Sequence, residues 1–323
     1  MRHYFCGPLR VSVDAQTHVL HEKVAETLRL YDRRWPAAEQ PVALTVVEAN
    51  GSAPALGRGT FLRCARMVVD SAGDGLHATT ISGSQARSRT NAGTEHWSID
   101  VPNAALGTAA FNDVEDLVVL ALTSGWRKAG WVPIHGAAVA KDGVCAILCA
   151  ASGVGKSTLT AAFIRRGWHA VGDDKLLLRV TSEGPELAAL QGTFNLHPQT
   201  QAWFPEVGEL EKLPLYSTWT QKRKVRVDSI WADAVVATAT PTHVIRVRRD
   251  PSSSALCVRE LPPADLFPTL IRQIAVPTER AAASLILRTV APTLRRVQGL
   301  DLAVGNDAYR RADALDALET ALR

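Results

Sequence analysis

The sequence has few cysteines, and their arrangement indicates neither a disulfide framework nor a metal site. There are five in 323 residues, an odd number, with no Cys-x-x-Cys pair and no Cys/His spacing typical of zinc. Cys145 and Cys149 lie in one apolar run at an even spacing, so we expect both to face the same buried side of a strand. This pattern favours reduced thiols and a cytoplasmic protein.

Long apolar runs are also absent. Residues 1–8 lack the apolar core of a signal peptide, and no later run approaches the length that spans a bilayer. There is no internal repeat and no low-complexity segment. The net charge of +4 and the pI of about 8.9 are too weak to indicate nucleic-acid binding by themselves. We therefore expect no membrane and no nucleic-acid partner.

A glycine-rich segment in mid-chain is the strongest functional signal. The apolar run 144–150 precedes Ser152-Gly153-Val154-Gly155-Lys156-Ser157-Thr158, and an amphipathic segment follows as far as Gly167. This order predicts a strand, a phosphate-binding loop of the Walker A type, and a helix. Ala150 stands where the usual motif has glycine. The alternative is an ordinary loop before a structural helix.

Each residue type in this segment suits a nucleotide. Glycine lets the loop curl so that its N–H groups converge on phosphate oxygens, and the following helix directs its positive end at the same anion. Lys156 can reach the β- and γ-phosphates of ATP, and the Ser157 hydroxyl can ligate Mg²⁺.

Two adjacent carboxylates follow the expected crossover helix. Asp173 and Asp174 come directly after the short expected strand 168–171. One carboxylate there can hold Mg²⁺ and the other can take a proton from an attacking hydroxyl. The alternative is a Gly-Asp-Asp surface turn.

Two domains are expected, both of α/β character. Residues 1–110 predict an α+β domain, with strands at 9–13, 42–47, 60–69, 77–81 and 95–101, a helix at 17–34 and a polar, flexible segment at 82–94. Substrate recognition is a possible role for this domain. Residues 112–323 predict the catalytic domain, with a mixed sheet. Its expected helices are 113–127, 263–275, 278–296 (interrupted by Pro292) and 307–322, and strands 187–195, 243–249, 257–261 and 299–304 are expected among others.

The strand before the phosphate-binding loop is expected to run antiparallel to its predecessor. The predicted strand 132–140 and the run 144–150 are joined by the short turn Lys141-Asp142-Gly143, which indicates a hairpin. Common P-loop ATPases instead join the strands around the loop through helices.

Residues 132–180 resemble the HPr kinase/phosphorylase family. The matching features are His135-Gly136, the segment from Ser152 to Ser157, Arg166-Gly167 and Asp173-Asp174, in that order. The resemblance implies a P-loop domain related in fold to phosphoenolpyruvate carboxykinase, which agrees with the expected hairpin.

The resemblance also implies roles for single residues. Asp173 would be the general base toward a serine hydroxyl, Asp174 and Ser157 would belong to the metal environment, and Lys156 would bind the phosphates. His135 would lie beside the reacting phosphate, although a histidine in a packed core is an alternative.

The chain departs from the carrier-protein kinases of this family. Thr158 stands where they usually have Glu, their glycine-rich signature with a metal-binding Glu is not recognisable after Asp174, and residues 1–110 do not match their N-terminal domain. The chain is more similar to divergent HPr-kinase-like proteins, some of which accompany lasso-peptide clusters and phosphorylate a precursor peptide on serine. HPr kinases form hexamers, so a homo-oligomer is possible.

A basic strand further along could serve the same site. Lys222, Lys224 and Arg226 share one face and could clamp phosphates, or they could guard a solvated edge strand. The residues Arg246, Arg248 and Arg249 favour an exposed edge.

The sequence thus predicts an ATP- and Mg²⁺-dependent kinase that transfers the γ-phosphoryl group to a serine-type hydroxyl of a peptide or protein. The residues expected to bind nucleotide are Ser152, Gly153, Val154, Gly155, Lys156, Ser157, Thr158, Lys222 and Lys224. Three alternatives remain open: a catalytically weak nucleotide-binding regulator, a small-molecule kinase, and a nucleotidyltransferase.

Overall fold

The chain forms two compact units of mixed α/β structure. A computed structural model describes residues 1–31, 33–35, 40–49, 62–63, 67–72, 75–102, 113–190, 193–215, 221–277, 279–305, 308–310 and 313–323. The first unit comprises Met1–Trp131 and Val276–Leu285, and the second Val132–Ala275 and Ile286–Arg323. The division therefore follows Trp131, and the helix expected at 113–127 belongs to the first unit rather than to the second.

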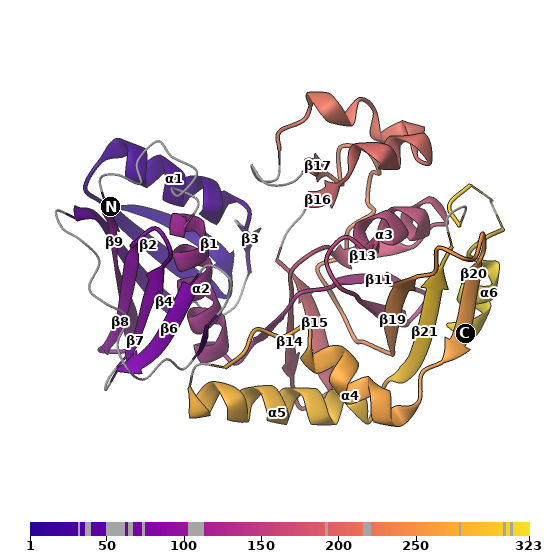
Figure 1. Ribbon diagram of the computed structural model, residues 1–323. Helices are drawn as coiled ribbons and strands as arrows, with labels where there is room; N and C mark the ends of the chain where they lie inside the picture. Colours follow the sequence, from indigo (N-terminus) through magenta and orange to yellow (C-terminus); the bar gives the residue numbers. More distant parts are fainter. Residues whose placement is uncertain are drawn as a thin grey trace. The chain divides into compact units, whose positions relative to one another are not determined.

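The first unit is built on one mixed sheet (Figure 1). The strands pair in the order β3-β1-β2-β4-β9-β8-β7-β6-β5. They are β1 (Arg2–Gly7), β2 (Leu9–Ala15), β3 (Arg33–Arg34), β4 (Gln40–Ala49), β5 (Leu62–Arg63), β6 (Met67–Ala72), β7 (Gly75–Thr80), β8 (Gln85–Asn91) and β9 (Thr94–Pro102). Strand β1 was not foreseen, and the segment expected as one strand at 60–69 lies partly outside the described residues.

Two helices pack against each other and against β2 and β4. Helix α1 (His18–Arg29) begins after Thr17, whose hydroxyl accepts from the Leu20 N–H, and it ends earlier than the expected residue 34. Helix α2 (Asp113–Lys128) lies very close to the sheet, since a Cβ on Gly125 would lie 2.9 Å from Val42 Cγ2. The Trp126 indole N–H donates to the Cys6 carbonyl at 2.9 Å.

The segment expected to be flexible at 82–94 contains a strand. Strand β8 pairs with both β7 and β9, with Ala86 and Ser88 buried and Arg87 and Arg89 outward. Its inward side chains are too small and polar to give an apolar alternation, so the period-two pattern was hidden in the sequence.

The second unit contains the sheet that carries the glycine-rich loop. The strands of this sheet pair in the order β13-β11-β12-β19-β21-β20, with β12, β19 and β21 mutually parallel. They are β11 (Ala137–Lys141), β12 (Val144–Cys149), β13 (His169–Gly172), β19 (His243–Arg249), β20 (Leu256–Glu260) and β21 (Gln298–Val304). The predicted hairpin is confirmed, because β11 and β12 pair antiparallel.

A second sheet pairs β10-β14-β15-β18, and β16 pairs with β17. These strands are β10 (Val132–Ile134), β14 (Leu176–Val180), β15 (Pro185–Ala189), β16 (Thr193–Leu196), β17 (Arg223–Arg226) and β18 (Thr238–Ala239). The strands expected at 132–140 and 187–195 are thus each divided between two sheets. Between them, the main-chain N–H of His135 donates to Gln273 O at 2.7 Å, so His135 belongs to neither β10 nor β11.

The remaining elements surround these sheets. Helix α3 (Lys156–Arg165) contacts β11 and β13. Residues 198–212 contain three short 3₁₀ helices, η3 (Pro198–Ala202), η4 (Pro205–Val207) and η5 (Leu210–Lys212). Helices α4 (Pro263–Ile271) and α5 (Arg280–Leu294, with Pro292 inside it) follow. The closing helix α6 (Asp316–Ala321) is shorter than the expected 307–322, part of which lies outside the described residues.

The strand that feeds the loop is fully packed. Cys145 and Cys149 are both buried, and burial raises the pKa of each thiol to about 12. No helix in the described part of the chain is long and apolar enough to cross a membrane.

Helix α6 is fastened to the end of α3 by one carboxylate. Glu319 accepts from Arg166 at 2.8 Å and from the Trp168 indole N–H at 2.9 Å, and Arg166 also pairs with Asp316. The bond from Arg166 lowers the pKa of Glu319 against the opposing effect of burial.

We expect Glu319→Ala to lower the free energy of unfolding by about 1–3 kcal/mol in urea at pH 7, because it leaves Arg166 and Trp168 without this acceptor. The lowered pKa means that the stabilisation is present at neutral pH and is lost as the pH falls through the folded-state pKa.

Glu209→Ala is the matched control, because Glu209 pairs with Lys212 on the surface and should change stability by less than about 0.5 kcal/mol. Equal effects of the two substitutions would contradict a fastening role for Glu319.

Candidate functional site

A cavity of about 200 Å³ lies over the loop between β12 and α3. The parallel strands β12, β19 and β21 all end at this edge of the sheet, where ligand sites of α/β proteins commonly lie. The lining includes every expected loop residue from Ser152 to Thr158, together with His135, Asp173, Asp174 and Lys222. The structure therefore brings together residues from separate parts of the chain.

The loop has the backbone that its glycines predict. Gly153 and Gly155 have φ values of 81° and 113°, a region that residues with a side chain rarely adopt. Gly155 caps α3 without a side-chain hydrogen bond. The first N–H groups of α3 are therefore available to an anion, together with the positive end of the helix.

Lys156 is buried at the centre of the loop. Its side chain is 7% exposed, and Nζ donates to Ala150 O at 2.9 Å and lies 3.3 Å from His135 Nε2. Burial lowers the pKa of Lys156, and the nearby carboxylates of Asp173 and Asp174 oppose this shift. The ammonium group is thus held by a carbonyl of the loop and by the imidazole of His135.

His135 connects Lys156 to Asp174. Its Nδ1 lies 3.2 Å from Asp174 Oδ1, and its Nε2 faces the ammonium of Lys156. Partial burial and the neighbouring Lys156 lower the pKa of His135, while Asp174 opposes them. A neutral imidazole that donates from Nδ1 to Asp174 and accepts from Lys156 at Nε2 satisfies all of these contacts.

The main chain of His135 is also fixed. Its N–H donates to Gln273 O, and the Gln273 side-chain amide, oriented with its nitrogen toward the loop, donates to His135 O at 2.8 Å and to Ala150 O at 3.2 Å. His135 is therefore not a histidine of the packed core, since its side chain is 44% exposed and lines the cavity.

Asp173 is a buried carboxylate with one oxygen unused. It is 1% exposed, Oδ2 accepts from the Asn195 N–H at 3.4 Å, and Oδ1 has no hydrogen-bond partner among the described residues. Burial and the adjacent Asp174 raise the pKa of Asp173 to about 6, against the opposing influence of the nearby Ser157 hydroxyl. Asp174 has the left-handed backbone that aspartate tolerates better than most residues, with φ of 68°.

The two expected lysines differ in position. Lys222 lines the cavity, whereas Lys224 does not and lies in β17 opposite Asn195. Arg226 pairs with Asp228 at the surface. Lys222 precedes β17, so the three cations do not all lie in one strand.

Several lining residues were not foreseen, among them Asn195, Arg249 and Tyr309. Asn195 follows from the β16 pairing, and Arg249 lies at the end of β19. The Tyr309 hydroxyl is buried and has no hydrogen-bond partner among the described residues, and burial raises its pKa. Arg249 could have been found by placing the ends of parallel strands at one edge, but no signal in the sequence indicates Tyr309.

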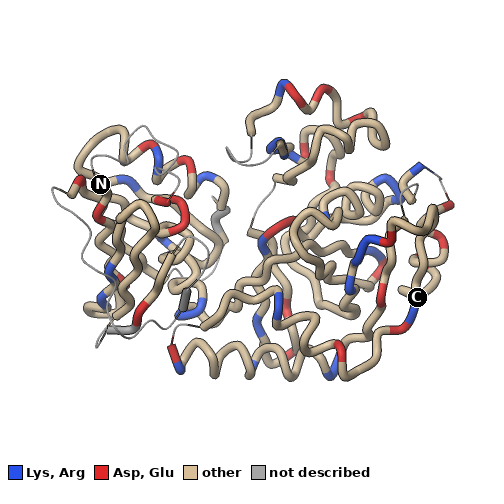
Figure 2. Tube along the Cα trace, viewed as in Figure 1, with Lys and Arg blue, Asp and Glu red and all other residues tan. Residues whose placement is uncertain are grey.

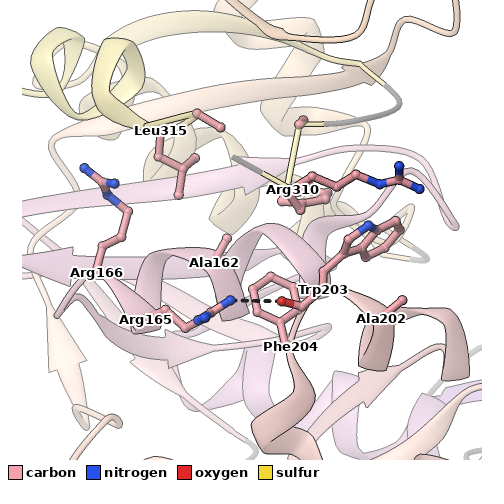
Figure 3. A pocket seen from close by; sticks show the side chains of 11 residues that line it. Ala162, Arg165, Arg166, Ala202, Trp203, Phe204, Arg310 and Leu315 are labelled. Carbon is pink, nitrogen blue, oxygen red and sulfur yellow. Dashed lines mark hydrogen bonds between the residues drawn. The ribbon is translucent and has the colours of Figure 1, made fainter. Parts of the chain in front are cut away.

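A neighbouring cavity of about 700 Å³ shares Trp203 and Tyr309 with this site. Figure 3 shows Arg165 and Arg166 at the end of α3 and the hydrogen bond from Arg165 to Trp203 O, which measures 2.9 Å. Arg165 also pairs with Glu206, and Arg166 pairs with Asp316 and Glu319. The positive charges of Arg165 and Arg166 are therefore already paired with carboxylates of the protein.

The donor set suits a cation that is shared with a substrate. Within the described residues, no group of three or more His, Cys, Asp or Glu could hold a metal ion alone. Mg²⁺ is commonly bound by one or two carboxylates together with phosphate oxygens. Asp174 and Ser157 fit that arrangement.

Comparison with known proteins gives only distant structural likenesses. No family model matches the sequence, and no curated protein is similar to it. Among solved structures, the Hpr(Ser) kinase/phosphatase from Coxiella burnetii aligns with a TM-score of 0.32 and 12% sequence identity, over 58% of this chain and 96% of that one. Values this low establish neither a family nor an activity, so a function must come from the cavity's own residues.

We expect Asp173→Asn to stabilise the protein at neutral pH. The raised pKa means that folded Asp173 holds its proton more tightly than in the unfolded chain, so the wild type loses stability as the pH rises from about 4 to about 6. The variant cannot ionise at this position. The difference in unfolding free energy should grow over this range to at most about 3 kcal/mol and then stay constant.

Unfolding in urea from pH 4 to 8 measures this difference. Asp228→Asn, at an exposed carboxylate beside Arg226, is the control and should show no such gain. Parallel pH profiles for the wild type and Asp173→Asn would show that Asp173 titrates normally.

Proposed function

We propose that this protein is an ATP- and Mg²⁺-dependent kinase that phosphorylates a serine-type hydroxyl of a peptide or protein. The observation that carries the proposal is the buried Asp173, whose free Oδ1 and raised pKa occur in the same cavity as the glycine-rich loop and Lys156. A phosphate-binding loop alone is compatible with many activities. A carboxylate prepared to accept a proton beside it favours transfer to a hydroxyl.

The nucleotide phosphates are held by the loop. The N–H groups from Gly153 to Ser157 surround the anion at the start of α3, and Lys156 and Lys222 add positive charge. Lys156 already donates to Ala150 O, so its ammonium is positioned before the phosphates arrive. Such preorganisation reduces the reorganisation needed at the moment of transfer.

Asp174 and Ser157 are the residues that would hold Mg²⁺, with Asp173 nearby. The ion supplies charge neutralisation on the terminal phosphates. His135 keeps the Asp174 carboxylate oriented through its Nδ1 contact at 3.2 Å.

Asp173 receives the proton in the proposed transfer. The acceptor hydroxyl gives its proton to Oδ1, its oxygen forms a bond to the γ-phosphorus, and the bond between that phosphorus and the β–γ bridging oxygen breaks to release ADP. A pKa of about 6 leaves Asp173 mostly ionised at neutral pH and still basic enough to accept a proton.

A nucleotide-binding regulator is the second candidate. It is favoured by the lack of a complete metal-ligand cluster among the described residues. ATP binding without transfer to any acceptor would identify it.

We expect Lys156→Ala to reduce phosphoryl transfer by roughly 10²-fold or more, because Lys156 is the buried cation of the loop. Intact-mass spectrometry of candidate acceptor peptides after incubation with Mg-ATP measures the added phosphoryl group and excludes nucleotidyl transfer. Asp173→Asn is the companion variant and should bind ATP but not transfer. Wild-type transfer by Lys156→Ala would refute the site.

The two lysines provide an internal comparison. Lys222→Ala should raise the KM for ATP by roughly 3- to 10-fold, because the lost cation lines the cavity, whereas Lys224→Ala should leave it unchanged. Steady-state kinetics with varied ATP separates them. Equal changes in both variants would contradict the placement of the nucleotide in this cavity.

A further inference from the structure

Another cavity, of about 710 Å³, opens on the other side of the glycine-rich loop and is called the α4 cavity. One wall is a face of α4 and its end, including Asp265, Thr269 and Arg272, which recur at helical spacing. The facing wall is β19, through Arg246 and Arg248. The residues in this cavity play no part in the nucleotide contacts proposed above, except where the two cavities meet.

The two cavities meet at His135 and Ser152, which line both. His135 Nε2 lies 3.3 Å from Lys156 Nζ, so the junction is at the Lys156 side of the loop. Lys156 is the residue that would contact the terminal phosphates. The α4 cavity therefore begins where a transferred phosphoryl group would lie.

The expectation of an exposed edge at Arg246 and Arg248 is wrong, because β19 lies between β12 and β21. Both arginines, which are among the blue positions in Figure 2, are fixed by the buried Asp301 of β21. Asp301 Oδ1 accepts from Arg246 Nε at 2.7 Å, and Oδ2 accepts from Arg248 Nε at 3.0 Å. Arg246 also donates to Asp265 at 3.2 Å.

Hydrogen-bond donors remain on two of the arginines after these pairings. Among the described residues, Arg246 and Arg248 pair with the carboxylates of Asp265 and Asp301, and Arg248 also interacts electrostatically with Asp250. The side chain of Arg248 is 45% exposed, and its terminal nitrogens make no hydrogen bond within the described residues. Arg272 is exposed and has no ion pair in that part of the chain. A guanidinium group with free N–H donors recognises a carboxylate through paired hydrogen bonds.

We propose that this cavity binds the acceptor peptide, and that Arg248 and Arg272 bind a carboxylate of that peptide close to the serine that is phosphorylated. The inference rests on the proposed kinase activity. In-line transfer requires the hydroxyl on the side of the terminal phosphate opposite to the leaving ADP, and this cavity meets the nucleotide cavity beside Lys156, the residue expected at the terminal phosphates. Its volume is in the range of sites that enclose a ligand of several linked groups.

The carboxylate can come from an Asp or Glu side chain or from the end of the peptide chain. Three fluorescein-labelled peptides of equal length, each with one serine, separate these sources. The first has Glu beside the serine and an amidated C-terminus. The second has Gln there and a free C-terminus directly after the serine. The third has Gln and an amidated C-terminus, so that no carboxylate is near the serine.

Fluorescence anisotropy with the full-length protein measures peptide affinity without any need for transfer. At least one carboxylate-bearing peptide should bind more tightly than the uncharged one, and Arg272→Ala should remove roughly 3- to 10-fold of that affinity. The affinity of the uncharged peptide should not change. Arg288→Ala, at an exposed arginine of α5 outside the cavity, is the matched control.

A charge reversal tests the direction of the effect. Arg272→Glu should bind a peptide with Lys beside the serine more tightly than the wild type does, which a general loss of structure would not produce. Equal affinity for all three peptides, or an Arg272→Ala variant that behaves like Arg288→Ala, overturns the inference.

The same peptides distinguish this failure from failure of the kinase proposal. If phosphoryl transfer occurs with the same KM for charged and uncharged peptides, and Arg272→Ala leaves those KM values unchanged, the kinase proposal would hold and the carboxylate site would be refuted. If peptide binding depends on Arg272 and ATP binds but no phosphoryl group is transferred, the kinase proposal would be refuted, and the acceptor role of the cavity with it.

Discussion

The burial of one ammonium group determines the form of the site. Lys156 is almost completely removed from water, and a buried cation is tolerated only where acceptors and negative charge surround it. The carbonyl of Ala150 and the imidazole of His135 are the direct acceptors, and Asp173 and Asp174 supply the charge. The break between β10 and β11, the turn after β13 and the end of β12 all have to meet at this group.

This requirement also accounts for the opposed behaviour of the two adjacent aspartates. Asp174 is held by His135 and keeps its place through a left-handed backbone, whereas Asp173 is buried with an oxygen unused. An unpaired buried carboxylate costs stability, and such a group is expected where a reaction or a ligand requires it. The folded protein is thus less stable than it would be with an apolar residue at position 173, which is where the chemistry is proposed.

The local pattern of the loop was predictable, because glycine, lysine and the flanking apolar and amphipathic runs are short-range signals. The same holds for the hairpin at Lys141-Asp142-Gly143 and for most of the strands in the parallel part of the sheet. The long-range pairings were less accessible. No local signal shows that β19 lies in the interior of a sheet, so its arginines resembled an exposed edge. Strand β8 resembled a loop because its inward positions are filled by the small residues Ala86 and Ser88, which give no apolar alternation.

Gln273 fixes a distance across the loop. Its main chain and side-chain amide together bond His135 at two positions and Ala150 at one, so the end of α4 and the edge of the glycine-rich loop form one wall with a chamber on either side. Such a wall fixes the distance between groups bound on its two sides, because that distance is set by the covalent geometry and hydrogen bonds of the protein. An acceptor whose hydroxyl is too near to or too far from its anchoring group would then be rejected by length alone, irrespective of its charge.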